Sequence, residues 1–242
     1  MYAIKTEGLT KKYKNLTAVD NLNLTVQQGT VCALLGVNGA GKTTTIKMLT
    51  CLTKPYSGNA FLHNNSIISD VAAVKSIIGV SPQETAVAPN LSVKENLELI
   101  CGLYGFTKNK RLSKIHELSL QFDLGTVLNK KAGTLSGGWQ RRVSIAMALI
   151  SEPKILFLDE PTLGLDVLAR SELWNIIRGL KGKITIILTT HYMEEAEVLA
   201  DSIGVMKEGK LLVLGTAEEI KAQTGKNNFE EAFIALVKGD RK

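Results

Sequence analysis

Residues 36–43 read Gly36-Val37-Asn38-Gly39-Ala40-Gly41-Lys42-Thr43, and this stretch decides the fold. The apolar run 31–35 precedes it, and apolar residues with helical spacing follow it. Glycines between a strand and a helix let backbone N–H groups turn inward around phosphate oxygens, and the helix start adds the positive end of its dipole. Lys42 is placed to reach terminal phosphates, and the Thr43 hydroxyl suits Mg²⁺. All fixed positions of the phosphate-loop pattern are filled, so we favour this interpretation over a glycine turn that only links strand to helix.

The flanking sequence predicts a layered α/β fold. Apolar runs with turn signals at 77–80, 155–158 and 184–188 are typical of buried parallel strands, and residues 19–26 predict a strand before the turn at Gln28-Gly29. Helical spacing lies between them, at 168–180 and 193–199. Strands that alternate with helices indicate a mainly parallel sheet. Residues 91–103, 112–122 and 139–150 break this alternation with three successive helical patterns, and 229–237 predicts a last helix.

Composition excludes several classes of protein. The chain has 242 residues, of which 45% are apolar and 21% charged, so it is neither disordered nor fibrous. No apolar run reaches the roughly 18–20 residues that span a bilayer, and Glu7 precedes any apolar core, which argues against a signal peptide. Three scattered cysteines suit packing in a reducing compartment. The net charge is +6, but its densest run, 108–114, lacks interleaved aromatics and predicts a solvated helix face; no nucleic acid is expected. We therefore expect a cytosolic protein.

A second chemical signal is Asp159-Glu160, which directly follows the apolar residues 155–158. A buried strand would deliver both carboxylates to the edge of the sheet where ligands of parallel α/β proteins bind. Asp159 is expected to hold the Mg²⁺ shell through water, and Glu160 to orient and polarise the attacking water. Two acids after a strand are often only turn residues, but their occurrence beside a phosphate loop favours the functional interpretation.

A third signal is Leu135-Ser136-Gly137-Gly138-Trp139 at the start of a predicted helix. The two glycines expose backbone N–H groups and Ser136 adds a hydroxyl, which together predict a second anion site. The alternative is an ordinary helix start with serine as its N-cap. A helix that opens this far along the chain need not face the same pocket, so we expect the second site to serve the nucleotide of another subunit.

This ordered set resembles the nucleotide-binding subunit of an ABC (ATP-binding cassette) transporter. It comprises the phosphate loop, Gln83, the segment 135–138, Asp159-Glu160, Asp166 and His191. The resemblance covers about residues 2–215, and the Leu-Ser-Gly-Gly segment separates this family from other phosphate-loop proteins. It implies a P-loop ATPase fold with a mainly parallel core sheet, an antiparallel β region near the N-terminus and an inserted helical subdomain. It also implies a single domain over 1–242, with a core lobe at about 1–84 and 151–215, a helical subdomain at 85–150 and a helical tail at 216–242.

The resemblance further implies ATP and Mg²⁺ as cofactors and two subunits that meet head to tail around two ATP molecules. Each ATP would contact the phosphate loop of one chain and Ser136, Gly137 and Gly138 of the other, with Asp166 meeting the partner. Gln83 and His191 resemble the residues that act with Glu160 in hydrolysis, and Thr43, Gln83 and Asp159 would serve Mg²⁺. The residues assigned to the nucleotide are Tyr13, which would stack on adenine, and Gly36, Val37, Asn38, Gly39, Ala40, Gly41, Lys42, Thr43 and Thr44.

The sequence departs from the family pattern at Trp139, where glutamine is usual. The glycine N–H groups contact phosphate, so activity is expected to survive this change. The segments 190–197 and 228–236 resemble the drug- and ion-exporting branch, which favours export of a drug-like compound, ion, lipid or peptide. We expect a separate membrane permease and a second ATP-binding subunit, either a copy or a paralogue, with the chain at the inner face of the cell membrane.

Three alternatives to an exporter subunit remain open at this stage. A soluble, DNA- or ribosome-associated ATPase of the same family would usually carry a coiled-coil insertion or two cassettes per chain, which this sequence lacks. A P-loop kinase would leave 135–138 unexplained. An importer subunit is the third alternative, and the preference for export over import rests on the tail alone.

Overall fold

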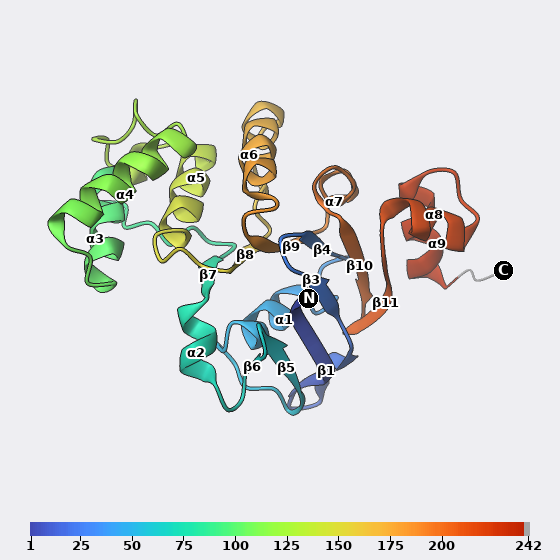
Figure 1. Ribbon diagram of the computed structural model, residues 1–242. Coiled ribbons are helices and arrows are strands. Elements are labelled where there is room, and N and C mark those ends of the chain that lie inside the picture. Colours follow the sequence, from blue (N-terminus) through green and yellow to red (C-terminus); the bar gives the residue numbers. More distant parts are fainter. Residues whose placement is uncertain (240–242) are drawn as a thin grey trace. The chain divides into compact units, whose positions relative to one another are not determined.

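The computed structural model describes residues 1–239 in two compact units, drawn in Figure 1. The first unit comprises Met1–Ser76 and the described residues from Lys181 onward, and the second comprises Ile77–Leu180. The last three residues of the predicted tail, 240–242, lie outside the described residues.

The first unit contains an antiparallel sheet built around the long strand β1 (Tyr2–Tyr13). Its strands run in the order β2-β1-β5-β6, and β3 also pairs with β1. The partner strands are β2 (Leu16–Leu22), β3 (Thr25–Gln27), β5 (Ser57–Leu62) and β6 (Asn65–Ser66). Tyr13 pairs with Leu16, so β1 and β2 form a hairpin whose tight turn contains Lys14 at φ 47°. The expected antiparallel region near the N-terminus is confirmed.

A mainly parallel sheet lies in the same unit. Strand β4 (Val31–Leu35) pairs in parallel with β9 (Thr185–Thr190) and β10 (Ser202–Lys207), and β11 (Lys210–Gly215) pairs antiparallel with β10. Every residue of β4 and β9 is buried, as expected for strands covered on both faces. The helices of this unit are α1 (Lys42–Leu49), α2 (Val71–Ser76), α7 (Met193–Leu199), α8 (Ala217–Thr224) and α9 (Phe229–Lys238).

The second unit combines two parallel strands with four helices and a short 3₁₀ turn. Strand β7 (Ile78–Ser81) pairs in parallel with β8 (Ile155–Asp159). The helices are α3 (Val93–Leu103), α4 (Lys108–Gln121), α5 (Gly137–Ala148) and α6 (Val167–Leu180), and the 3₁₀ turn is Ala132–Thr134. The apolar faces of the helices contribute fully buried side chains, including Leu97, Phe122 and Val143, to the core. The three helices predicted from 91 to 150 are confirmed.

Several elements differ from the sequence-based expectation. Residues 19–26 do not form one strand, because β2 ends at Leu22 and β3 begins at Thr25. The helix expected from residue 91 begins at Val93, since Ser92 and Glu95 form a capping box at its start.

Cys32 and Cys101 are buried, and burial raises the pKa of Cys32 to about 11, whereas Cys51 is only part-buried.

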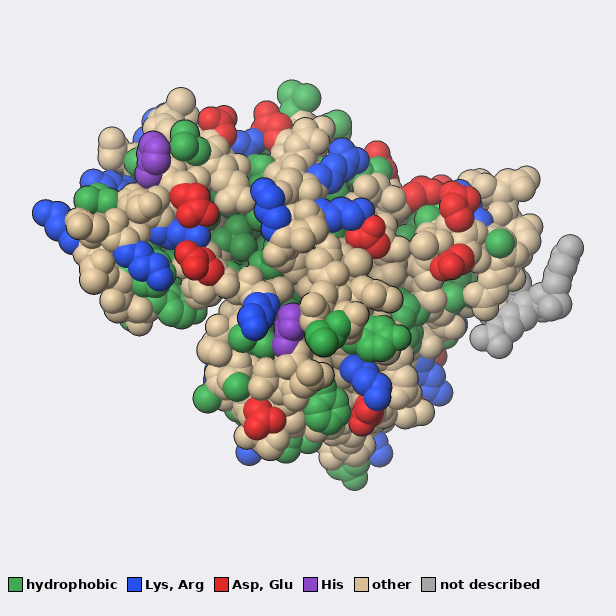
Figure 2. Space-filling view, in the orientation of Figure 1, with side chains coloured by type: hydrophobic (Ala, Val, Ile, Leu, Met, Phe, Trp, Pro, Cys, Tyr) green, Lys and Arg blue, Asp and Glu red, His purple; other side chains and the backbone are tan. Residues whose placement is uncertain are grey.

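Two surface properties bear on function. Across the described residues, no helix has both the length and the apolar character needed to span a membrane. On the face drawn in Figure 2, lysine and arginine side chains lie among aspartates and glutamates and do not form one continuous basic track.

Candidate functional site

The phosphate loop follows β4 and is enclosed by backbone on two sides. A Cβ atom on Gly36 would lie 2.4 Å from the Met206 carbonyl oxygen, and one on Gly41 would lie 2.5 Å from that of Ala18. Gly41 also has φ 101°, which favours glycine, and it is the N-cap of α1. Glycine is therefore required at both ends of the loop, and the loop leads directly into the start of α1.

Lys42 lies almost entirely within this loop. Its side chain is only 5% exposed, and its Nζ donates hydrogen bonds to the carbonyls of Gly36, at 2.8 Å, and Val37, at 3.3 Å. The first turn of α1 contains no acidic residue, so nothing in that turn opposes the positive end of the helix dipole. The loop therefore concentrates one ammonium group and a helix start at the place where the sequence predicts phosphate.

Tyr13 is connected to the phosphate loop through the β1–β2 hairpin. It lies at the end of β1, about half exposed, with the Lys11 Nζ 5.0 Å from its ring centre. Ala18, on the paired strand β2, is the residue whose carbonyl closes over Gly41. An aromatic ring with an open face thus belongs to the same hairpin that borders the loop.

His191 emerges beside the start of the loop. Strands β4 and β9 are parallel, Leu35 is in register with Thr190, and the Gly36 N–H donates to the Thr190 carbonyl at 3.3 Å. His191 follows directly and packs against Tyr192, with 4.1 Å between ring centres. The first unit therefore brings together the phosphate loop and the predicted switch histidine.

The second unit brings Gln83 and the two acids to one end of its strands. Ser81 of β7 is in register with Leu158 of β8, so Gln83 and Asp159-Glu160 leave the same edge. Both acids are more than nine-tenths buried, while Gln83 is exposed. This places the predicted water-activating acid and the predicted magnesium-sensing amide just after the ends of two neighbouring strands.

Glu160 has an unusual backbone. Its φ is 49°, in the left-handed region that a residue with a side chain adopts at a cost of about 1 kcal/mol, and Pro161 follows it. Such conformations cluster at active sites, where surrounding structure holds them in place. The buried carboxylate is thus aimed by a strained turn, which sequence alone did not predict.

The helix start at Ser136 differs from an ordinary capped start. Ser136 is the N-cap residue of α5, yet within the described part of the chain its hydroxyl makes no capping hydrogen bond. Ser136 and Gly137 are exposed, and a Cβ atom on Gly137 would meet only Leu165, at 3.7 Å. The serine hydroxyl and the first N–H groups of α5 therefore face solvent, which weakens the interpretation of Ser136 as a simple cap.

Asp166 lies next to this helix start. Its carboxylate accepts a hydrogen bond from the Ala169 N–H at 2.9 Å and caps α6, as the simpler interpretation of this residue expected. A Cβ atom on Gly138 would lie 3.0 Å from that of Ala169, so the two helix starts are in contact. Val167 and Leu168 are each 76% exposed beside Asp166. Three of the four residues predicted to meet the partner subunit, Ser136, Gly137 and Asp166, are thus exposed on one partly apolar rim, and the fourth, Gly138, is half-buried beside them.

One residue of this unit was not singled out from the sequence. Arg141 is 4% exposed and donates hydrogen bonds to the carbonyls of Pro82, at 2.6 Å, and Gln83, at 2.5 Å. Its position one helical turn after the glycines gave no signal of this contact, because the sequence does not reveal which loop faces that side of the helix.

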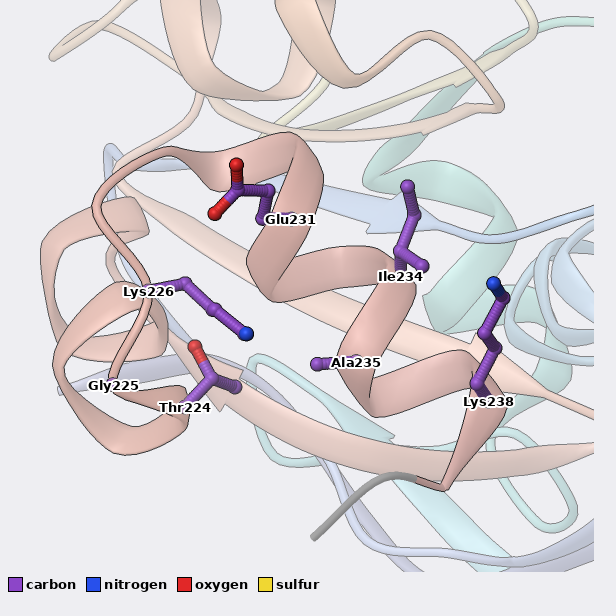
Figure 3. A pocket seen from close by; sticks show the side chains of 7 residues that line it. All are labelled: Thr224, Gly225, Lys226, Glu231, Ile234, Ala235 and Lys238. Carbon is purple, nitrogen blue, oxygen red and sulfur yellow. The ribbon is translucent and has the colours of Figure 1, made fainter. Parts of the chain in front are cut away.

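A further pocket lies in the tail, away from all predicted site residues along the chain. Figure 3 shows it between α8 and α9, where it has a volume of about 360 Å³. Its lining residues are Thr224, Gly225, Lys226, Glu231, Ile234, Ala235 and Lys238.

Comparisons with known proteins show which family the chain belongs to. A family model described as ABC transporter matches residues 19–163. The daunorubicin resistance ATP-binding protein DrrA3 of Streptomyces coeruleorubidus is 41% identical over 224 residues, which make up 92% of this chain and 71% of that protein. The probable multidrug ABC transporter ATP-binding protein YbhF of Escherichia coli is 37% identical over 240 residues, which make up 97% of this chain and 41% of that protein.

A solved dimeric ATP-binding cassette, in a post-hydrolysis state bound to ADP and Pi, has a TM-score of 0.79 and 28% identity. The match covers 88% of this chain and 98% of that one. The fold and motifs define a phosphate-loop ATPase, and the chain belongs to the ABC transporter family. It is an ATP-binding subunit that hydrolyses ATP for transport, and subunits of this kind dimerise and work with a permease. The family and the fold class expected from the sequence are confirmed.

Proposed function

We propose that two copies of this cassette, or one copy and a paralogue, close head to tail around two ATP molecules and drive export through a separate permease. The observation that carries the proposal is the contrast between an enclosed phosphate loop and an exposed second helix start at Ser136 in the same chain. In this proposal each chain supplies its phosphate loop to one ATP and its second helix start to the other.

The phosphate-loop side binds the nucleotide. The loop residues 36–41 present their N–H groups to the phosphates. Lys42 moves its ammonium from the loop carbonyls to the terminal phosphates, and Thr44 also contacts the phosphates. The exposed ring of Tyr13 stacks on adenine. The partner's phosphates are contacted by Ser136, Gly137 and Gly138, while Asp166 and its apolar neighbours Val167 and Leu168 contact the partner chain.

The residues present also suit Mg²⁺. Among the described residues, no cluster of three or more histidine, cysteine or acidic side chains forms a cage for a metal. This agrees with an ion held largely by water and phosphate with few protein ligands, as Mg²⁺ prefers. Thr43, Gln83 and Asp159, the last through water, would hold it, and the bound ion would neutralise charge on the terminal phosphates.

Glu160 is the catalytic carboxylate in this proposal. It is buried and follows β8 directly, so it can accept a hydrogen bond from the attacking water and hold it in line with the terminal phosphate. His191 donates a hydrogen bond to the same phosphate and keeps the water in place. Gln83 acts with Glu160 and His191 in hydrolysis once the nucleotide is bound.

Replacement of Glu160 by glutamine tests this assignment. Glu160→Gln keeps the size of the side chain but removes the negative charge, so turnover is expected to fall about a thousandfold while ATP binding persists. Hydrolysis is followed by phosphate release, and dimer formation by light scattering with ATP and Mg²⁺. We expect a stable ATP-bound dimer. Turnover at the parental rate would contradict the role of Glu160, and a monomer under these conditions would contradict the shared site.

Export is supported by the relatives DrrA3 and YbhF, whose names describe daunorubicin resistance and multidrug transport. We propose that this chain likewise serves a drug-like compound, an ion, a lipid or a peptide, from the inner face of the cell membrane. The permease would dock on residues 84–100 and the adjoining end of α3. There Leu99, Leu103 and Tyr104 are about half to three-quarters exposed, and Leu99 and Leu103 lie one helical turn apart.

A matched pair of substitutions tests the docking surface. Leu103 on α3 is 75% exposed and Leu120 on α4 is 71% exposed, so aspartate at either place leaves the core intact. Tagged Glu160→Gln protein is captured from solubilised membranes with ATP and Mg²⁺, and the partners are identified by mass spectrometry. We expect a multi-span membrane protein, lost with Leu103→Asp and retained with Leu120→Asp. Equal capture by both variants would place docking elsewhere, and ribosomes or nucleic acid in place of a membrane protein would contradict transport.

A further inference from the structure

Helix α5 is attached along its length to β7 and the loop that follows it. The hydroxyls of Ser144 on α5 and Ser81 on β7 lie 2.8 Å apart and are buried. A Cβ atom on Gly79 would lie 2.3 Å from the carbonyl oxygen of Ala148, so the helix rests directly on the strand backbone. Helix α5 and strand β7 therefore run in opposite directions along their contact.

Arg141 extends this attachment to Gln83. Its buried guanidinium donates to the carbonyls of two consecutive residues, Pro82 and Gln83, from two different nitrogens. A planar fork that makes two charge-assisted hydrogen bonds fixes direction as well as distance. The backbone of Gln83 is thus fixed to the helix that begins at Ser136, while its side chain remains exposed.

We propose that Arg141 is a positioning residue for ATP hydrolysis, which keeps Gln83 and the Ser136 helix start in one fixed relation. The inference rests on the proposed function, in which Gln83 serves the chain's own ATP and Ser136 serves the partner's. The consequence is that a shift of Gln83 on nucleotide binding moves the helix start that contacts the second ATP. Two sites that share no ligand are coupled through one buried side chain.

A double-mutant cycle tests this role. Arg141→Gln is made in the parent chain and in Gln83→Ala, and steady-state turnover is measured at saturating ATP and Mg²⁺. If Arg141 acts through Gln83, its loss lowers turnover about tenfold in the parent and less than about twofold in the Gln83→Ala background. Arg141→Lys, which keeps the charge but not the fork, is expected to recover part of the rate.

Ser144→Ala is the matched control. It removes a buried hydrogen bond between α5 and β7 but none to the Gln83 loop, so its effect on turnover is expected to be the same factor in both backgrounds. Thermal unfolding confirms that each variant is folded at the assay temperature. Arg141→Lys takes the place of Arg141→Gln in the cycle if the latter is unfolded.

Three results would overturn the inference. An equal loss from the Arg141 substitution in both backgrounds would show that it acts independently of Gln83, and the proposed function would stand. Unchanged turnover in the Arg141 variants would show that Arg141 has no role in hydrolysis, and the proposed function would again stand. Parental turnover in Gln83→Ala alone would remove the proposed role of Gln83 and this inference with it.

Discussion

The chain contains two glycine-rich helix starts, and they are built in opposite ways. The start of α1 is enclosed: Gly36 and Gly41 have no room for a side chain, and Lys42 is buried within its own loop. The start of α5 is open: Ser136 and Gly137 face solvent, and Gly137 has ordinary space around its Cβ position. In the proposed function these two glycine-rich segments therefore have different tasks: the enclosed start surrounds the chain's own nucleotide, and the open start completes the nucleotide site of a partner subunit.

The largest effect is expected at the enclosed start. Lys42→Ala removes charge-assisted hydrogen bonds to the phosphates, so the Kd for ATP should rise about a hundredfold, and turnover should fall with it. Isothermal titration calorimetry with ATP and Mg²⁺ measures the affinity of the isolated subunit. An unchanged Kd would show that this loop is not the primary nucleotide site, and the contrast between the two starts would disappear.

A smaller and different effect is expected at the open start. Gly137→Asp fits the available space and suits a helix N-terminus, but it sets a negative charge against the partner's phosphates. We expect about a thirtyfold loss of turnover with no change in the Kd of the isolated subunit for ATP.

Gly137→Ala is the matched control for that substitution, because it fills the same space without charge and should keep most of the activity. Equal losses from Gly137→Asp and Gly137→Ala would mean that packing, and not charge, explains the defect. A weakened Kd in Gly137→Asp would place this helix start at the chain's own nucleotide.

The smallest effect is expected at Trp139. Its ring stacks on the guanidinium of Arg142, 4.6 Å away, and Arg142 also pairs with Glu172 on α6. Trp139→Gln, which restores the usual family residue, should lower the free energy of unfolding by about 0.5–1 kcal/mol. Turnover should change less than about threefold, since the glycine N–H groups remain. Urea unfolding and phosphate release measure the two quantities, and a tenfold change in turnover would give the indole a direct role.

Sequence alone predicted most elements of the core, because their signals are local. The run Val31–Leu35 forms a strand with those bounds, and the periodic pattern at 193–199 forms α7. The hydrophobic pattern did not identify the long strand β1, since its burial alternates irregularly around Gly8 with its positive φ, and only the family resemblance implied an antiparallel region there. Helix α8 lies within the helical tail expected at 216–242, but its bounds were not predicted, although Thr216 and Glu219 form a capping box that the sequence could have revealed.

The candidate site also divides into parts with local sequence signals and parts without them. The phosphate loop, Asp159, Glu160 and His191 follow strands directly, so order along the chain was enough to predict their place at strand ends. The hydrogen bonds of Arg141 to Pro82 and Gln83, and the contact of Gly138 with Ala169, join segments far apart in sequence. No periodic pattern encodes which loop meets which face of a helix.

The left-handed backbone of Glu160 also bears on how this cassette evolves. Glycine would adopt this backbone without strain, so selection for folding alone does not favour the glutamate. In the proposed function, selection for turnover keeps Glu160 in place, as it does at other strained active-site residues. A duplicated copy released from catalysis would therefore be free to lose Glu160, while Gly41 would persist because the fold itself requires it.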